Sequence, residues 1–323
     1  MTNRRRTGFA TWLGGVCAGL VCQAGTWYVS PLGGDAGHGA GWPSAQRTIQ
    51  AAVDLAVAGD TVLVTNGVYA LSRQVTIEKP VEVRSVNGPS TTIVQGRPGV
   101  RCFALTHAAA NLAGFTITNG QVAAYQNGGG VWSRGIIRDC VIAGNQAPTG
   151  SGGGLYNLGE ARNCVITGNT AGDCGGGVYN QGLLRNCLIA GNTGGNGGGV
   201  FNFSDSLIES CTIVRNTSDH GGVNNYGEVR NSILYSNVYG NILSLYGNGS
   251  DQVRYCCVTP APPGEGNVAE NPRLTADDRL AEGSPCINAG ANQPWMRAAG
   301  DLGGAPRISD DRVDIGAYEF KPR

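Results

Sequence analysis

Residues 174–202 read CGGGVYNQGLLRNCLIAGNTGGNGGGVFN, and this stretch decides the fold. It contains GGGVYN at 175–180 and a near copy, GGGVFN, at 197–202, with NCLIAGNT at 186–193 between them. A glycine triplet, an aromatic residue and an asparagine that return at nearly even spacing indicate a structural repeat rather than an isolated binding loop.

The repeat continues over much of the chain in aligned rows. A row of small residues defines the register, at Cys140, Cys164, Cys187, Cys211, Ser232 and Cys256, so that successive units are 21 to 24 residues long. The other rows are Asn145, Asn169, Asn192, Asn216 and Asn237; Asn157, Asn180, Asn202 and Asn225; Asp139, Asn163, Asn186, Ser210 and Asn231; and Gly130, Gly154, Gly177, Gly199 and Gly222.

Units of this length fit few repeat classes. The leucine pattern of leucine-rich repeats is absent, and a glycine triplet would break the helices of helical repeats. Each unit instead has three short extended runs, separated by polar bends at the asparagine rows. The sequence therefore predicts an all-β protein, a single-stranded right-handed parallel β-helix of about nine coils of ~23 residues, with a short N-terminal capping helix.

The cysteine row is expected to form an internal ladder. In a run such as Cys164-Val165-Ile166, alternation places Cys164 and Ile166 inside and Val165 outside. In-register side chains on neighbouring coils are parallel and do not converge as a disulfide requires, so we expect free thiols. The other four cysteines after the N-terminal segment leave room for one disulfide: Cys102, Cys174, Cys257 and Cys286.

The N-terminal residues resemble an export signal. MTNRRRTGF is basic, ATWLGGVCAGLV is apolar but too short to span a membrane, and Ala24 is a small residue suited to cleavage before Gly25. We therefore expect a signal peptide at 1–24 and an exported protein that is extracellular, at the cell surface or periplasmic. The β-helix is expected at 25–260, including an N-terminal cap at 25–59, and a closing segment at 261–323.

Composition narrows the choice of partners. The chain has 23 basic and 23 acidic residues, a balance that implies neither nucleic acid nor an anionic membrane as a partner. No later stretch is apolar enough to span a bilayer, and we expect a monomer.

Three segments resemble known families. Residues 27–69, with TIQAAVDLA and GDTVLV, resemble the N-terminal part of the pectin-lyase-like β-helix superfamily. The GGG(V/L)YN and NCxIxGNT units resemble the repeats of polymorphic outer-membrane proteins. SPCINAG at 284–290 and VDIGAYEF at 313–320 resemble the closing motif of choice-of-anchor Q surface proteins, in which an anchor usually follows. No anchor segment follows the motif before Arg323, so the mode of surface attachment stays open.

Two rows are candidate ligand-binding surfaces. The first, two residues before the cysteines, is a line of positive charge suited to an acidic polysaccharide, or a solvated face that Glu209 bridges. It consists of Arg138, Arg162, Arg185, Glu209, Arg230 and Arg254. The second should face outward as a platform for sugar rings, or as a self-stacking ladder. It consists of Trp132, Tyr156, Tyr179 and Phe201.

Catalytic chemistry has weaker support in the sequence. The resemblance implies a fold that hosts lyases, hydrolases and adhesins, yet the acids of residues 125–258 occupy different repeat positions and should not converge. No cofactor is evident. The C-terminal acids suit either salt-bridged capping or a calcium site: Asp301, Asp310, Asp311, Asp314 and Glu319.

We therefore expect a protein that binds polysaccharide or another surface polymer without catalysis. A polysaccharide lyase or glycoside hydrolase is one alternative reading. A structural or adhesive module that contacts protein is the other.

Overall fold

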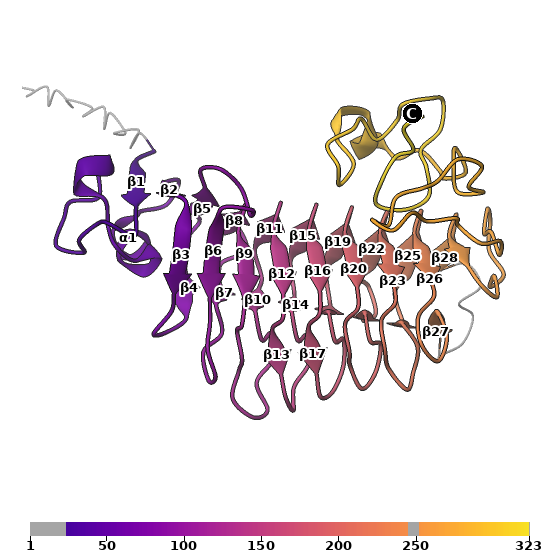
Figure 1. The fold of residues 1–323 in the computed structure, drawn as a ribbon, viewed down its shortest axis with the longest axis horizontal. Coiled ribbons are helices and arrows are strands. Elements are labelled where there is room, and N and C mark those ends of the chain that lie inside the picture. Colours follow the sequence, from indigo (N-terminus) through magenta and orange to yellow (C-terminus); the bar gives the residue numbers. More distant parts are fainter. Residues whose placement is uncertain (1–23, 245–251, 323) are drawn as a thin grey trace, which may run out of the picture.

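The computed structural model describes residues 24–244 and 252–322, so the expected signal peptide lies outside the described residues except for Ala24. In the described part, short parallel strands wind into a long solenoid, and each coil contributes to three sheets in turn (Figure 1). The right-handed parallel β-helix that the sequence predicts is confirmed. No helix in these two ranges is long and apolar enough to cross a membrane.

The three sheets contain ten, eight and nine described strands, which bracket the nine coils expected. The ten-stranded sheet consists of β1 (Thr26–Val29), β2 (Thr61–Val64), β5 (Glu82–Ser85), β8 (Asn111–Ala113), β11 (Ile136–Arg138), β15 (Glu160–Arg162), β19 (Leu183–Arg185), β22 (Leu207–Glu209), β25 (Glu228–Arg230) and β28 (Val253–Arg254). The eight-stranded sheet consists of β4 (Val75–Ile77), β7 (Phe103–Leu105), β10 (Val131–Ser133), β14 (Leu155–Asn157), β18 (Val178–Asn180), β21 (Val200–Asn202), β24 (Val223–Asn225) and β27 (Ile242–Ser244). The nine-stranded sheet consists of β3 (Gly67–Ala70), β6 (Thr92–Gln95), β9 (Thr116–Thr118), β12 (Val141–Ala143), β16 (Val165–Thr167), β20 (Leu188–Ala190), β23 (Thr212–Val214), β26 (Ile233–Tyr235) and β29 (Cys257–Val258). A small fourth sheet pairs β13 (Gln146–Ala147) with β17 (Thr170–Ala171).

Two ladders of asparagine side chains run inside the corners of the solenoid. Asn169 Nδ2 donates to Asn192 Oδ1 at 2.9 Å, and Asn192 Nδ2 donates to Asn216 Oδ1 at 3.0 Å. A second ladder joins Asn157, Asn180, Asn202 and Asn225, with 2.8 Å between successive Nδ2 and Oδ1 atoms. These asparagines are buried, so the amides satisfy one another and the backbone of adjacent coils.

The asparagines that adopt left-handed backbone are in a different row, immediately before the cysteines. Asn163, Asn186 and Asn231 have φ angles of 52°, 51° and 50°. This conformation costs most residues energy but is tolerated by Asn and Asp. The row therefore bends the chain through its backbone, whereas the two buried ladders stabilise the bends through their side chains.

The glycine triplets have three separate requirements. The first glycine, such as Gly175, has a φ of +63°. A Cβ on the second, Gly176, would lie 2.4 Å from the carbonyl oxygen of Gly198 in the next coil. A Cβ on the third, Gly177, would lie 2.9 Å from the Asn192 amide nitrogen. Each position therefore needs a residue without Cβ, which accounts for three glycines rather than one.

The N-terminal cap contains the expected helix and one strand that the sequence did not predict. Helix α1 (Ile49–Leu55) begins after Thr48, whose side chain accepts a hydrogen bond from the Ala51 N–H, and it buries Ile49 and Val53. GDTVLV at 59–64 contains β2, which is the second strand of its sheet, because β1 precedes the helix and pairs with β2 in parallel. Strand β1, before helix α1, is therefore the edge strand of the ten-stranded sheet, and β2, after the helix, lies next to it.

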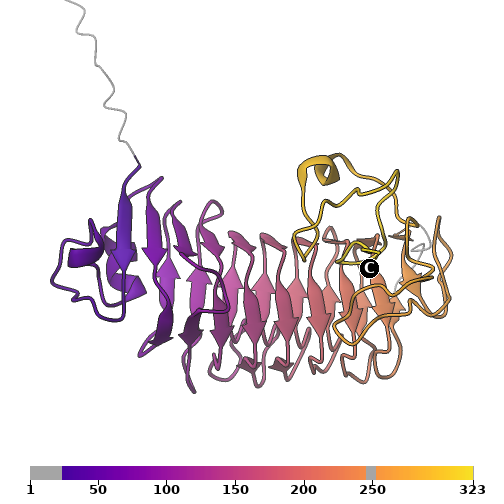
Figure 2. The same cartoon turned by 45° about the horizontal axis from the view of Figure 1, so that its top comes forward.

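The C-terminal segment, residues 261–322, does not continue along the axis. After Val268 pairs with Cys257 of the last coil, the chain turns back and lies against the solenoid, as Figures 1 and 2 both show in yellow. It contains the short 3₁₀ helix η3 (Pro294–Ala298). Apolar side chains that face outward from the nine-stranded sheet, including Leu188 and Val214, are buried beneath it.

Candidate functional site

The arginine row lies on the outer face of the ten-stranded sheet, in the predicted register. Arg138, Arg162 and Arg185 are neighbours on adjacent strands, followed by Glu209, Arg230 and Arg254. Arg84 belongs to the same column, with Ala113 between it and Arg138. The row is therefore continuous from β11 to β28, interrupted by one acid.

Every arginine of this row forms an ion pair within the protein. The pairs join Arg138 to Glu82 and Asp139, Arg162 to Glu160, Arg185 and Arg230 to Glu209, and Arg254 to Glu228. Several of these acids occupy the first position of the same strands, so the sheet presents acids and arginines side by side. The outer face is consequently close to charge-balanced rather than a bare line of positive charge.

Glu209 is the centre of this arrangement. Its carboxylate has no exposed surface and accepts from Arg185 Nε at 2.9 Å and Arg230 Nε at 2.7 Å. The C-terminal segment adds a lid: the Arg185 guanidinium lies 4.2 Å from the ring centre of Trp295. Asn186 Nδ2 also donates to the Gly300 carbonyl at 2.8 Å. A polymer therefore cannot contact the row along its full length.

The aromatic row lies on a different sheet and is uncovered. Trp132, Tyr156, Tyr179 and Phe201 are in register on the outer face of the eight-stranded sheet. The rings of Tyr156 and Tyr179 stack with centroids 4.6 Å apart and 2° between planes, and those of Tyr179 and Phe201 at 5.1 Å and 4°. The flat faces in this stack contact one another, so the ring edges remain for solvent or a ligand.

A second outward column, two residues after the first, widens the surface. Phe203 is 41% exposed, and its ring centre lies 6.3 Å from that of Tyr179. Tyr226 packs against Phe201 at 5.4 Å, and Arg134 lies 5.7 Å from the Trp132 ring centre. This column was not predicted from the sequence because its members are not one residue type, although each lies two residues after a position of the aromatic row.

We call Trp132, Tyr156, Tyr179, Phe201, Phe203 and Tyr226 together the aromatic face. Partial burial raises the pKa of the Tyr156 and Tyr179 phenols, so both remain neutral hydrogen-bonding groups near neutral pH. Gln181 Nε2 donates to the Tyr179 hydroxyl at 3.4 Å. The face thus offers apolar edges and a few neutral polar atoms.

The C-terminal acids are engaged by the protein itself. Asp301 accepts from the Ala305 and Glu319 N–H groups at 2.7 and 2.8 Å. Asp314 accepts from Asn288 and Phe320 N–H at 2.7 and 2.6 Å. In the described ranges no cluster of His, Cys, Asp and Glu has an arrangement that could hold a metal ion. Among the ion pairs of the described residues, Glu319 is the one acid of this group that takes part, with Arg307 at 3.3 Å, whereas Asp301 and Asp314 accept backbone hydrogen bonds.

No family model matches the chain, and no curated protein matches it. Among solved structures, a pectate lyase is similar at 17% identity, with 92% of this chain and 96% of that chain covered and a TM-score of 0.43. A pectin methylesterase from Aspergillus niger is similar at 12% identity, with coverages of 83% and 92% and a TM-score of 0.49. A rhamnogalacturonan lyase is similar at 13% identity, with coverages of 90% and 96% and a TM-score of 0.37. These similarities are too distant to support a conclusion about the function of this chain.

Proposed function

We propose that this β-helix binds an extended polysaccharide or similar surface polymer along the aromatic face, without acting on it chemically. The observation that carries the proposal is the in-register aromatic array of Trp132 to Phe201, which is free of the C-terminal segment and widened by exposed Phe203. Contiguous apolar surface on a soluble protein marks an interaction site.

The geometry changes the kind of polymer that we expect. The arginine row is paired within the protein, so negative charge on the polymer is not the main attraction. Ring edges and neutral tyrosine hydroxyls carry no charge, so their apolar contacts and hydrogen bonds with a sugar would not depend on the charge of that sugar. We therefore expect neutral and acidic polysaccharides to be retained, with weak dependence on salt.

The test is affinity electrophoresis of the purified protein through gels that contain neutral or acidic polysaccharides. Phe203→Ala should weaken retention about tenfold, as loss of a central aromatic contact does at other interfaces. Leu32→Ala is the control, because Leu32 is 95% exposed and far from the aromatic face in the chain. Equal retention of wild type and Phe203→Ala would reject the site.

The same samples distinguish the two alternatives. Release of sugar fragments from any polysaccharide would replace the proposal with a lyase or hydrolase. Retention by no polysaccharide would leave an adhesive module that contacts protein as the better reading.

We propose further that the chain is exported, with cleavage before Gly25. The Gly25 nitrogen lies 2.6 Å from Oδ1 of Asp60, a carboxylate that is 3% exposed. Cleavage of the Ala24–Gly25 peptide bond would turn the Gly25 nitrogen into an ammonium group. The buried Asp60 carboxylate would then have a positively charged partner. The likeness of 284–290 and 313–320 to surface β-helix proteins supports the same location. N-terminal sequencing of secreted protein should begin at Gly25; material that retains Met1 would contradict export by this route.

A further inference from the structure

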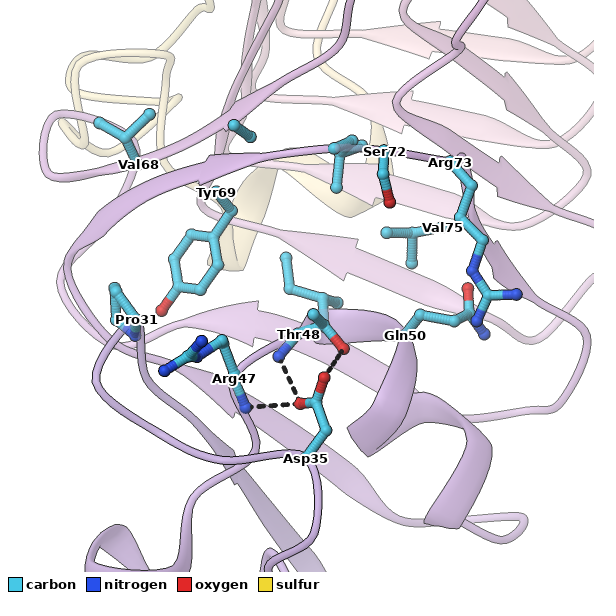
Figure 3. A pocket seen from close by; sticks show the side chains of 13 residues that line it. Pro31, Asp35, Arg47, Thr48, Gln50, Val68, Tyr69, Ser72, Arg73 and Val75 are labelled. Carbon is cyan, nitrogen blue, oxygen red and sulfur yellow. Dashed lines mark hydrogen bonds between the residues drawn. The ribbon is translucent and has the colours of Figure 1, made fainter.

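A pocket of about 370 Å³ lies where the N-terminal segment meets the first coil (Figure 3). Its walls include Arg47 and Thr48 before helix α1, Tyr69 and Ser72 at β3 and after it, and Arg73 before β4. Figure 3 shows Arg47 on one side of the pocket and Arg73 on the other, with Thr48 between them. The volume is near the lower end of the range for small-molecule sites, about 300–1,000 Å³.

The pocket has positive charge that the protein does not neutralise. Its one acid, Asp35, accepts from Arg47 N at 2.7 Å, Thr48 N at 2.9 Å and Thr48 Oγ1 at 3.1 Å, which holds the loop together. The Arg47 guanidinium donates from Nε to the Gly33 carbonyl at 3.1 Å. No carboxylate of the described residues forms an ion pair with Arg47 or Arg73, in contrast to every member of the arginine row.

The remaining wall is apolar. Tyr69 is 6% exposed, and its hydroxyl is engaged with the Thr65 carbonyl at 3.1 Å. The edge of the Tyr69 ring and the exposed side chain of Val68 give the pocket its apolar wall. A ligand that fills this space needs an uncharged body with acidic groups toward its ends.

We propose that this pocket binds a small ligand with two anionic groups, in the manner of an acidic disaccharide, with Arg47 and Arg73 each facing one acidic group. The guanidinium fork matches carboxylate and sulfate oxygens, each of which can accept two parallel hydrogen bonds. The site is built from residues of the cap and the first coil and is separate from the aromatic face. It stands or falls independently of polymer binding there.

Isothermal titration of the purified protein with three disaccharide probes tests the proposal. The probes are digalacturonate, a disulfated disaccharide and neutral maltose. We expect binding of one or both acidic probes, about tenfold weaker binding of them for Arg47→Ala and for Arg73→Ala, and no effect of either substitution on any heat signal from maltose. Arg297→Ala is the control, because Arg297 is an exposed arginine near the other end of the molecule.

The outcomes are separable. Preference for the carboxylated or the sulfated probe identifies the acidic group that the pocket selects. No binding of either acidic probe, or unchanged affinity for them in both arginine variants, would overturn the proposal. Arg47→Lys keeps the positive charge but lacks the guanidinium group that can donate two parallel hydrogen bonds. If this variant binds the acidic probe more weakly than wild type and more tightly than Arg47→Ala, paired hydrogen bonds contribute to the affinity. Phe203→Ala should bind the acidic probes as wild type does, which separates this site from the aromatic face.

Discussion

Glu209 replaces an arginine in its row and changes the character of the whole face. Arginines stacked on adjacent strands repel one another, and an acid between two of them converts that repulsion into attraction. Arg185 and Arg230 bond to separate oxygens of the same carboxylate, which is completely buried. A single acid in the row thus joins the arginines of the two adjacent coils and offsets one of their two charges.

The substitution Glu209→Gln should lower the free energy of unfolding by about 3 kcal/mol, because it leaves the partly covered Arg185 guanidinium without a counter-charge and leaves Arg230 only its longer pair with Glu228 at 3.6 Å. Urea denaturation measures the loss. Glu160→Gln is the matched control: its pair with Arg162 is more exposed and should contribute less than about 1 kcal/mol. Equal midpoints for the two variants would show that the buried carboxylate is unimportant.

The ladder cysteines share a hydrogen bond. Cys187 Sγ lies 3.1 Å from the Arg185 carbonyl, and the Ser232 hydroxyl makes the same bond to Arg230 at 2.8 Å. Serine can therefore replace cysteine in this row. The structure has the nine described cysteines as free thiols, Cys102, Cys174, Cys257 and Cys286 among them.

Native alkylation at pH 7 should leave the ladder unmodified. The ladder thiols are buried, which excludes the reagent, and burial raises the pKa of Cys140 and Cys187 and raises that of Cys256 to about 12. Of the described cysteines only Cys174 is partly exposed. Its partial burial and, to a smaller extent, the neighbouring Asp173 carboxylate raise its pKa to about 12, so Cys174 should react slowly. Peptide mapping before and after unfolding in urea checks this. Fast modification of Cys187 in the native protein would contradict the register.

At the scale of single elements, the asparagine ladder stabilises the corners between strands. Asn192 Nδ2 donates to the Ile166 carbonyl as well as to Asn216, and its Oδ1 accepts from Asn169. Asn192→Ala should therefore cost about 2–3 kcal/mol, because buried donors and acceptors lose their partner. Urea denaturation of Asn87→Ala, at an exposed position, should differ from wild type by less than about 0.5 kcal/mol. A similar small loss for Asn192→Ala would mean that the ladder adds little.

Elements that repeat could be predicted from the sequence, and elements that do not repeat could not. Cys140, Asn145 and Arg138 each recur at a fixed spacing, so their register and inward or outward direction followed from alternation. The partners of the arginines were harder to predict, because Glu82 is 56 residues from Arg138 and precedes the regular units.

The N-terminal pocket was not predictable for the same reason. Asp35, Arg47 and Arg73 come from three irregular segments and meet only when the cap folds on the first coil. Strand β1 was missed because Thr26–Val29 has no repeat partner in the sequence. Two interpretations of the aromatic row and of the arginine row were open from the sequence, and only the packing between coils showed stacked rings and paired charges.

At the scale of the whole molecule, the C-terminal segment makes stability depend on pH. Arg307, Glu319 and Asp314 are buried there, with Arg307 NH1 3.3 Å from Glu319 Oε1. Burial raises the pKa of Glu319 to about 8 against 4.5 in a free side chain, although Arg307 partly opposes the shift. Burial also raises the pKa of Asp314.

Because the folded state holds the proton more tightly, stability from Glu319 is complete below about pH 4.5 and is lost as pH rises through about 8. The slope is at most about 1.4 kcal/mol per pH unit for this group. Urea midpoints from pH 4.5 to 9 measure it. Glu319→Gln should flatten the decline, whereas Glu282→Gln, at an exposed position, should not; a decline that is unchanged in Glu319→Gln would assign it to other groups.

The folded-back C-terminal segment also bears on how the array unfolds. Stacked repeats contact only their neighbours, so such arrays tend to open one unit at a time from an end. Here Ala291 bonds to Asn231, Ala317 to Thr212 and Gly300 to Asn186, which ties three successive coils to one strap. Those coils cannot separate singly without releasing the strap, so the C-terminal third behaves as one cooperative block, while the coils nearer the N-terminus keep the graded, local behaviour of a linear chain of units.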